Sequence, residues 1–148
     1  MSLKEKINND LKAAMKSGDK VRLETIRSIR ALILEYEKSG KKTEMTSDDE
    51  ITMLNSALKK RKEAIEQFEK GNRPELAAKE KFELQIILEY LPKQLTKNEI
   101  FEEVKKMAIE INAVSKADFS KLMPLAAKNL KGKADGKDIK AAVEKLLV

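Results

Sequence analysis

Apolar residues recur at helical spacing along the whole chain, and little in the sequence interrupts them. Between residues 51 and 68 they keep the three- and four-residue steps that place side chains on one helix face, with Arg61 as the single charged residue in the series. Only five glycines and three prolines occur in 148 residues, so little material remains for strands joined by tight turns. The periodicity therefore predicts an all-α protein.

Turn and capping residues divide the pattern into separate helices. Glycine is favoured just beyond a helix end, which places the first break at Ser17-Gly18 and a later one at Gly71-Asn72. Asp19 is suited to cap the second helix, since its side chain can accept a backbone N–H of the first turn. Ser47 and Glu50 have the spacing of a capping box, in which each side chain accepts the other residue's N–H. These signals predict two successive helical hairpins.

Pro92 marks the clearest boundary between parts of the chain. A residue that precedes proline is disfavoured in the helical conformation, so the fourth helix should end before it. Thr96 and Glu99 then form a second capping box, and the three helical segments that follow are shorter than those before. We therefore predict a four-helix, hairpin-rich N-terminal bundle over residues 1–92 and a small three-helix module over residues 93–148.

Cysteine and histidine are absent. Their absence excludes disulfides, thiolate nucleophiles, zinc fingers and triads that use imidazole as the base. Neither a P-loop nor a dinucleotide-binding glycine motif occurs, and no run approaches the ~18 apolar residues of a membrane span. We therefore expect no catalytic residue, no metal, no cofactor and no membrane partner, and a cytoplasmic location.

The charge is basic and unevenly distributed. The net charge is +6 and the isoelectric point about 9.3. Residues 1–43 carry +5 and residues 115–148 carry +4, whereas residues 44–92 carry −3. Basic ends favour a polyanionic partner such as RNA, and the acidic middle favours a protein partner. Aromatic residues make up only 4%, so RNA would be held through its phosphates rather than by base stacking.

The loop before the last helix is the candidate anion site. Asp135 can cap that helix, and the remaining N–H groups of its first turn carry the positive end of the helix dipole. Gly132 and Gly136 lack side chains, which would let a bulky ligand approach the backbone. The alternative is a capped loop with solvated lysines. The predicted RNA-binding residues are Lys128, Lys131, Gly132, Lys133, Asp135, Gly136, Lys137 and Lys140.

Arg61 stands out because it occupies an apolar seam position, where an unpaired charge is costly. If the third and fourth helices turn at Gly71-Asn72, Arg61 faces Glu83, with Glu80 close enough to share it. We predict an internal Arg61–Glu83 pair that sets the helix register rather than performing catalysis. The three lysines around Arg61, at positions 59, 60 and 62, point in different directions and are interpreted as a solvated face.

The arginines of the second helical segment leave two interpretations open. Arg27 and Arg30 share one side of that helix, because residues three positions apart are neighbours on the helix surface. Together with Arg22 they could bind phosphate groups, or they could form ion pairs with Glu24 or Glu35. The sequence alone does not choose between the two roles.

Several stretches, taken in order, resemble the YqeY-like proteins. Those proteins are related to the tail domain of the B subunit of the tRNA-dependent aspartyl/glutamyl amidotransferase. The resemblance implies an all-α fold with a larger N-terminal part and a small C-terminal part, and a surface that contacts tRNA. The stretches that carry it are residues 11–16, 19–20, 22–27, 60–68, 79–80, 90–92 and 131–137.

The function that follows is a non-catalytic tRNA-binding accessory protein. The family label, a carbon–nitrogen ligase with glutamine as amido-N-donor, is not expected of this chain alone, because the chain is too short for a catalytic body and lacks nucleotide-binding motifs. The alternative is a helical adaptor that docks on tRNA-charging enzymes or amidotransferase proteins. The oligomeric state is left open.

Overall fold

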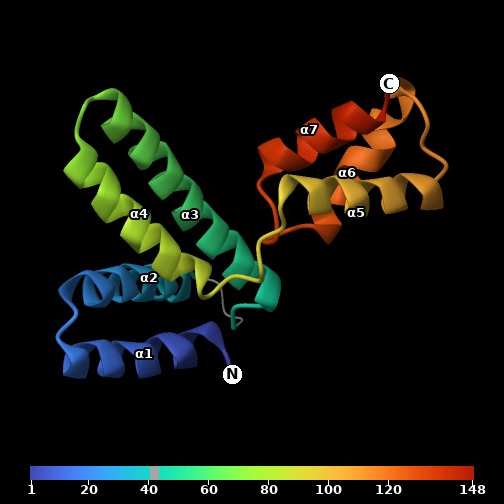
Figure 1. Ribbon diagram of the computed structural model, residues 1–148. Coiled ribbons are helices and arrows are strands. Elements are labelled where there is room, and N and C mark those ends of the chain that lie inside the picture. The colour runs from blue at the N-terminus through green and yellow to red at the C-terminus, as the bar shows by residue number, and fades with distance from the viewer. Residues whose placement is uncertain (41–43) are drawn as a thin grey trace. The chain divides into compact units, whose positions relative to one another are not determined.

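A computed structural model describes residues 1–40 and 44–148 of the chain. All regular elements in these two ranges are helices, so the all-α prediction is confirmed (Figure 1). The contacts divide the chain into two compact units, Met1–Leu91 (unit 1) and Pro92–Val148 (unit 2).

The first hairpin of unit 1 is formed by α1 (Leu3–Ser17) and α2 (Lys20–Lys38), as the turn signals predict. Gly18 ends α1 in the left-handed conformation, at φ +74°, and its N–H donates to the carbonyl of Ala14. Asp19 caps α2, because its Oδ1 accepts the N–H of Arg22 at 3.1 Å. A two-residue connection therefore joins the antiparallel helices.

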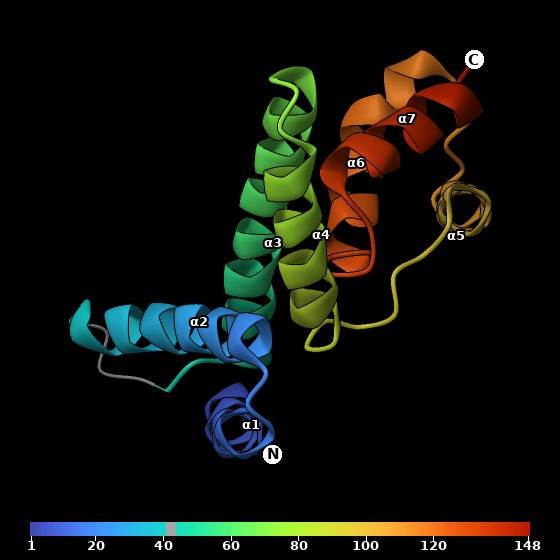
Figure 2. The ribbon, with the colours of Figure 1, turned by 60° about the vertical axis from the view of Figure 1, so that its left-hand side comes forward.

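The second hairpin is formed by α3 (Ser47–Lys70) and α4 (Pro74–Leu88), and α2 packs across α4 (Figures 1 and 2). The turn lies at Gly71-Asn72, with Asn72 at φ 56°, and Pro74 is the first helical residue. Local residue types thus determined both ends of the turn.

The N-cap of α3 differs by one residue from the prediction. Thr46, not Ser47, caps the helix: its Oγ1 accepts the N–H of Asp49, and Asp49 Oδ2 accepts the N–H of Thr46, both at 3.1 Å. Glu50 instead accepts the N–H of Leu3 at 3.3 Å. Both residue pairs have capping-box spacing, so a contact with α1 decides between them.

The apolar core of unit 1 covers only part of the second hairpin. Ile26 and Ile29 of α2 and Ile87 of α4 are completely buried, and the buried residues of α3 all lie between positions 54 and 58. Farther along the hairpin, residues 62–82 form a two-helix arm in which Ala77 is the one buried residue. Figure 1 shows this arm extending beyond α2.

Unit 2 contains α5 (Lys97–Glu110), the short helix η1 (Lys116–Asp118), α6 (Phe119–Asn129) and α7 (Gly136–Leu146). Thr96 caps α5 in the predicted capping box with Glu99. Pro124 lies inside α6. Val104, Leu122 and Val143, one from each main helix, are fully buried at the centre of a separate core.

Candidate nucleic-acid interface

The connection between α6 and α7 displays a group of exposed lysines in unit 2. Lys131 and Lys133 are exposed on the connection itself, and Lys128, Lys137 and Lys140 are exposed on the flanking helices. Lys140 lies 3.9 Å from the carboxylate of Glu144. The other four lysines form no ion pair with any residue that the structure describes, so their charges are available to an external anion.

The segment that precedes α5 holds the backbone of this connection. Gln94 Nε2 donates to the carbonyl of Gly132 at 2.6 Å and to that of Pro92 at 2.9 Å. The N–H of Leu95 donates to the carbonyl of Lys133 at 2.8 Å. Two hydrogen bonds therefore join this segment to the connection, and the bond to Pro92 fixes the side chain of Gln94. They order the loop while its lysine side chains extend into solvent.

Gly132 does not have the role predicted for it. It is buried, at φ +81°, a conformation that favours glycine, and its carbonyl is bonded to Gln94. Gly132 therefore allows the turn and does not offer backbone to a ligand. Gly136 is exposed, and a side chain added there would meet no atom within 4 Å, so open space for a ligand remains at that position.

The start of α7 is less positive than predicted. Asp135 is the N-cap, and its Oδ1 accepts the N–H of Lys137 at 3.1 Å. Asp138, which is not among the predicted site residues, adds a second carboxylate in the first turn. Because two carboxylates oppose the positive end of the helix dipole, attraction of an anion depends on the lysines.

The arginines of α2 have separate roles. Arg22 donates to both carboxylate oxygens of Glu89, at 2.8 and 3.2 Å, and so pairs with neither of the predicted partners. Glu24 lies 3.7 Å from Lys79. Arg27 and Arg30 are exposed and form no ion pair within residues 1–40 and 44–148. Phosphate binding therefore stays an option for these two and not for Arg22.

A second polar contact lies beside Arg22 and was not predicted. The Tyr90 hydroxyl donates to Asp10 Oδ2, which joins the end of unit 1 to α1. Burial, together with this hydrogen bond, raises the pKa of Tyr90 above its ordinary value. Asp10 and Tyr90 are 80 positions apart, so no local pattern in the sequence could reveal the contact.

Arg61 is held where α2, α3 and α4 meet. Its Nε lies 3.3 Å from Glu83 Oε2, and the two side chains are 17% and 13% exposed. Its Nη2 donates to Ser28 Oγ at 3.2 Å, and its Nη1 to the carbonyl of Ala57 at 3.4 Å. Partners on three helices indicate a structural role for this charge.

Glu80 lies one turn before Glu83, and its pKa is raised by burial and then by the negative charge of Glu83. A carboxyl group with a raised pKa in the folded state makes the protein less stable as pH rises from the unfolded to the folded pKa. We expect Glu80→Gln to increase the stability of unit 1 at pH 7. At pH 3 we expect little change, because Glu80 is then protonated in both the folded and the unfolded protein. Urea unfolding at the two pH values measures this difference.

The matched control for this prediction is Glu63→Gln, which removes an exposed carboxylate from α3. The control should leave stability nearly unchanged at both pH values. A Glu80→Gln variant that is less stable than the wild type at pH 7 would show that the Glu80 charge supports the fold through Arg61, contrary to the prediction.

Residues 1–40 and 44–148 offer neither a carboxylate metal site nor a membrane-spanning helix. These ranges contain no group of three or more acidic side chains arranged to hold a metal ion. Within the same ranges no helix has both the length and the apolar character needed to cross a membrane.

Known proteins resemble this chain along most of its length. The model of the family described as "Yqey-like protein" matches residues 4–147. An uncharacterised protein of Schizosaccharomyces pombe is 36% identical over 91 residues, which cover 62% of this chain and 73% of that protein. A Pyrenophora tritici-repentis protein named "Altered inheritance of mitochondria protein 41, mitochondrial" is 30% identical over 131 residues, which cover 87% of this chain and 71% of that protein. The protein of the same name in Vanderwaltozyma polyspora is 35% identical over 88 residues, which cover 57% of this chain and 46% of that protein.

Proposed function

The chain belongs to the YqeY-like family, and from this we propose that it is a non-catalytic accessory protein that binds tRNA. The observation that supports the proposal most directly is the group of exposed, unpaired lysines on the ordered connection before α7. Lysines on an ordered backbone can contact successive phosphates at a lower entropic cost than lysines on a mobile tail.

Phosphate contacts suit the side chains that the protein offers. The hydroxyl groups of Tyr36 and Tyr90 are bonded to Asp49 and Asp10 inside unit 1. Base stacking on these rings is therefore not part of the proposal. Folded RNA would be recognised by its backbone and shape, with little dependence on base sequence.

The compartment that we propose is the cytoplasm, where the basic chain would meet tRNA. The word "mitochondrial" in the names of two relatives describes those proteins. Amide formation is not part of the proposed role. The purified chain should produce no amidated product from ATP, glutamine and misacylated tRNA, and production of amide would contradict the non-catalytic assignment.

The test of tRNA binding is a filter-retention titration over a series of salt concentrations. For a phosphate-binding protein the logarithm of the association constant falls linearly with the logarithm of the salt concentration, with a slope of about −0.9 per contacted phosphate in duplex regions. We expect retention at low salt and such a slope. No retention at any salt concentration would reject the function.

The double variant Lys131→Ala with Lys133→Ala locates the contact. Both side chains are exposed, so the free energy of unfolding should change by no more than ~0.5 kcal/mol. The affinity for tRNA should fall and the salt slope should become shallower by up to ~2. The matched control, Lys105→Ala with Lys116→Ala, removes two exposed lysines elsewhere in unit 2 and should leave the slope closer to that of the wild type. Equal slopes for the two double variants would exclude the loop as the binding surface.

A second candidate function is a protein–protein adaptor, and the arm of unit 1 favours it. Leu76 and Phe82 of α4 are 38% and 49% exposed, in a part of the chain whose net charge is −3. The arm itself carries five basic and five acidic residues, so its exposed apolar side chains, rather than its charge, would contact a protein partner such as a tRNA-charging enzyme. An adaptor of this kind would show little tRNA retention at physiological salt and would lose its partner on substitution Phe82→Ser.

A further inference from the structure

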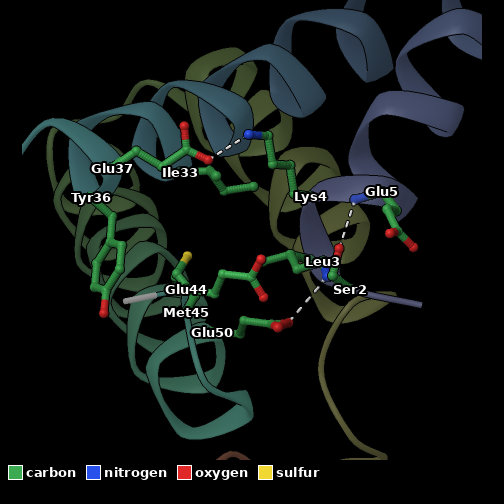
Figure 3. Close-up of a pocket in the computed structure, with 10 residues that line it drawn as sticks. All are labelled: Ser2, Leu3, Lys4, Glu5, Ile33, Tyr36, Glu37, Glu44, Met45 and Glu50. Atoms are coloured by element: carbon green, nitrogen blue, oxygen red, sulfur yellow. Dashed lines mark hydrogen bonds and ion pairs between the residues drawn. The ribbon is translucent and has the colours of Figure 1, made fainter. Parts of the chain in front are cut away.

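A pocket of about 430 Å³ lies in unit 1, far along the chain from the lysine-bearing loop (Figure 3). Its walls come from the start of α1, the end of α2 and the segment that leads into α3. The size falls within the range of sites that hold small molecules. The residues that line it are Ser2, Leu3, Lys4, Glu5, Ile33, Tyr36, Glu37, Glu44, Met45 and Glu50.

Hydrogen bonds between elements fix the walls of this pocket. The N–H of Leu3 donates to Glu50 Oε2 at 3.3 Å, which ties α1 to α3. The Tyr36 hydroxyl donates to Asp49 Oδ2 at 3.0 Å, which ties α2 to the start of α3. A pocket whose walls are already ordered loses little conformational entropy when a ligand enters.

One part of the lining is apolar. Leu3 and Ile33 are only 5% and 2% exposed, and Met45 is partly buried against the same core. The accessible hydrocarbon therefore comes from Met45 and from the ring of Tyr36, which is also only partly buried. This surface would favour the methylene chain of a ligand over water. An ion without a hydrocarbon part would leave this surface unused.

The charged part of the lining is strongly acidic. The described residues of the lining supply four carboxylates and one ammonium group, and that ammonium, of Lys4, is bonded to Glu37 at 2.6 Å. Figure 3 shows the side chain of Glu5 directed away from the pocket and those of Glu44 and Glu50 directed towards it. Glu44 makes no hydrogen bond or ion pair with the described residues. The pocket thus offers negative charge beside hydrocarbon, although the chain as a whole is basic.

We propose that this pocket binds a small protonated aliphatic amine, with the ammonium group at Glu44 and Glu50 and the hydrocarbon chain against Met45 and the ring of Tyr36. An ammonium group can donate to both carboxylates at once. An anion of the same shape would be repelled by the same groups. The proposal does not depend on tRNA binding.

The experiment is a titration of the full-length wild-type protein with n-hexylammonium chloride, followed by amide chemical shifts in two-dimensional NMR. We expect saturable shifts at pocket residues, weaker binding of n-ethylammonium because it leaves the apolar wall uncovered, and no saturable shifts with hexanoate. Equal binding of hexanoate, or no saturation at pocket residues up to about 50 mM amine, a range that covers the weak affinities of fragment-sized ligands, would overturn the proposal.

Two single variants test the placement of the charge. Glu44→Gln should weaken hexylammonium binding about fivefold, the effect of one partly exposed ion pair. Glu5→Gln is the matched control, since it removes a rim carboxylate that points away, and should change the affinity less than twofold. Both side chains are exposed, so both variants should fold. Equal affinity of the Glu44→Gln variant and the wild type would reject the site.

Discussion

Arg61→Ala is expected to lower the free energy of unfolding of unit 1 by about 3 kcal/mol. The substitution leaves the carboxylate of Glu83, which is 13% exposed, without its cation. It also removes the donor to Ser28 Oγ that links α3 to α2. A buried charge that loses its partner keeps its desolvation cost, and this cost accounts for most of the expected effect.

Tyrosine fluorescence during urea unfolding measures this effect. Both tyrosines of the chain, Tyr36 and Tyr90, belong to unit 1, so the signal follows that unit. Lys60→Ala is the matched control, because it removes a neighbouring, exposed charge from the same helix and should cost less than ~0.5 kcal/mol. A loss below about 1 kcal/mol for Arg61→Ala would show that the pair is solvated and weak, as exposed ion pairs are.

The double variant Arg61→Met with Glu83→Leu separates the pair from the packing around it. Replacing both charges by apolar side chains of similar size removes the desolvation cost together with the attraction. We expect it to recover most of the stability that Arg61→Ala loses. If it is as unstable as the single variant, the hydrogen bond to Ser28, and not the charge of Glu83, accounts for the contribution of Arg61.

Leu122→Ala should destabilise unit 2 by about 3 kcal/mol and leave unit 1 unchanged. Leu122 is fully buried, and truncation of a buried leucine loses both transfer free energy and packing around the cavity that remains. Most of the buried apolar residues belong to two clusters, one in each unit, and the clusters have no member in common among the described residues. Loss of packing in one cluster should therefore not be transmitted to the other.

Two spectroscopic signals distinguish the units in this experiment. Far-ultraviolet circular dichroism reports the helices of both units, whereas tyrosine fluorescence reports unit 1 alone. In the Leu122→Ala variant we expect part of the dichroism to be lost at lower urea while the fluorescence midpoint stays constant. Ile29→Ala, in the core of unit 1, should move the fluorescence midpoint instead. A Leu122→Ala variant in which both signals shift equally would show that the units unfold together.

Much of the fold could be predicted because its signals are local. Gly18 and Asp19 act within one turn of their own positions, and each stands at the helix end where it was expected. That Arg61 lies opposite Glu83 also follows from a local signal, the turn between α3 and α4. Once the turn at Gly71-Asn72 is known, the constant rise of two antiparallel helices determines which residues lie opposite each other, and the 3.3 Å distance agrees with that register.

The candidate interface could be predicted only in part. The exposure of its lysines could be predicted from the sequence, because charged side chains beside a helix start remain in solvent without any partner from elsewhere in the chain. Gly132 was assigned to the ligand surface, but a glycine in the sequence is equally compatible with two roles. It can let a ligand approach the backbone, or it can allow a buried turn. Its burial under Gln94, 38 positions away, decides for the turn.

The sequence by itself determined the helices, their ends and the positions that face a core, since periodicity and capping depend on neighbouring residues. Beyond the local caps and the Arg61–Glu83 pair, tertiary structure alone decided which polar groups meet. It selected Thr46 over Ser47 as a cap, joined Tyr90 to Asp10, paired Arg22 with Glu89 and enclosed the acidic pocket. The physical reason is that polar side chains are bonded by geometry in three dimensions, and many arrangements of the same helices would satisfy the same local pattern.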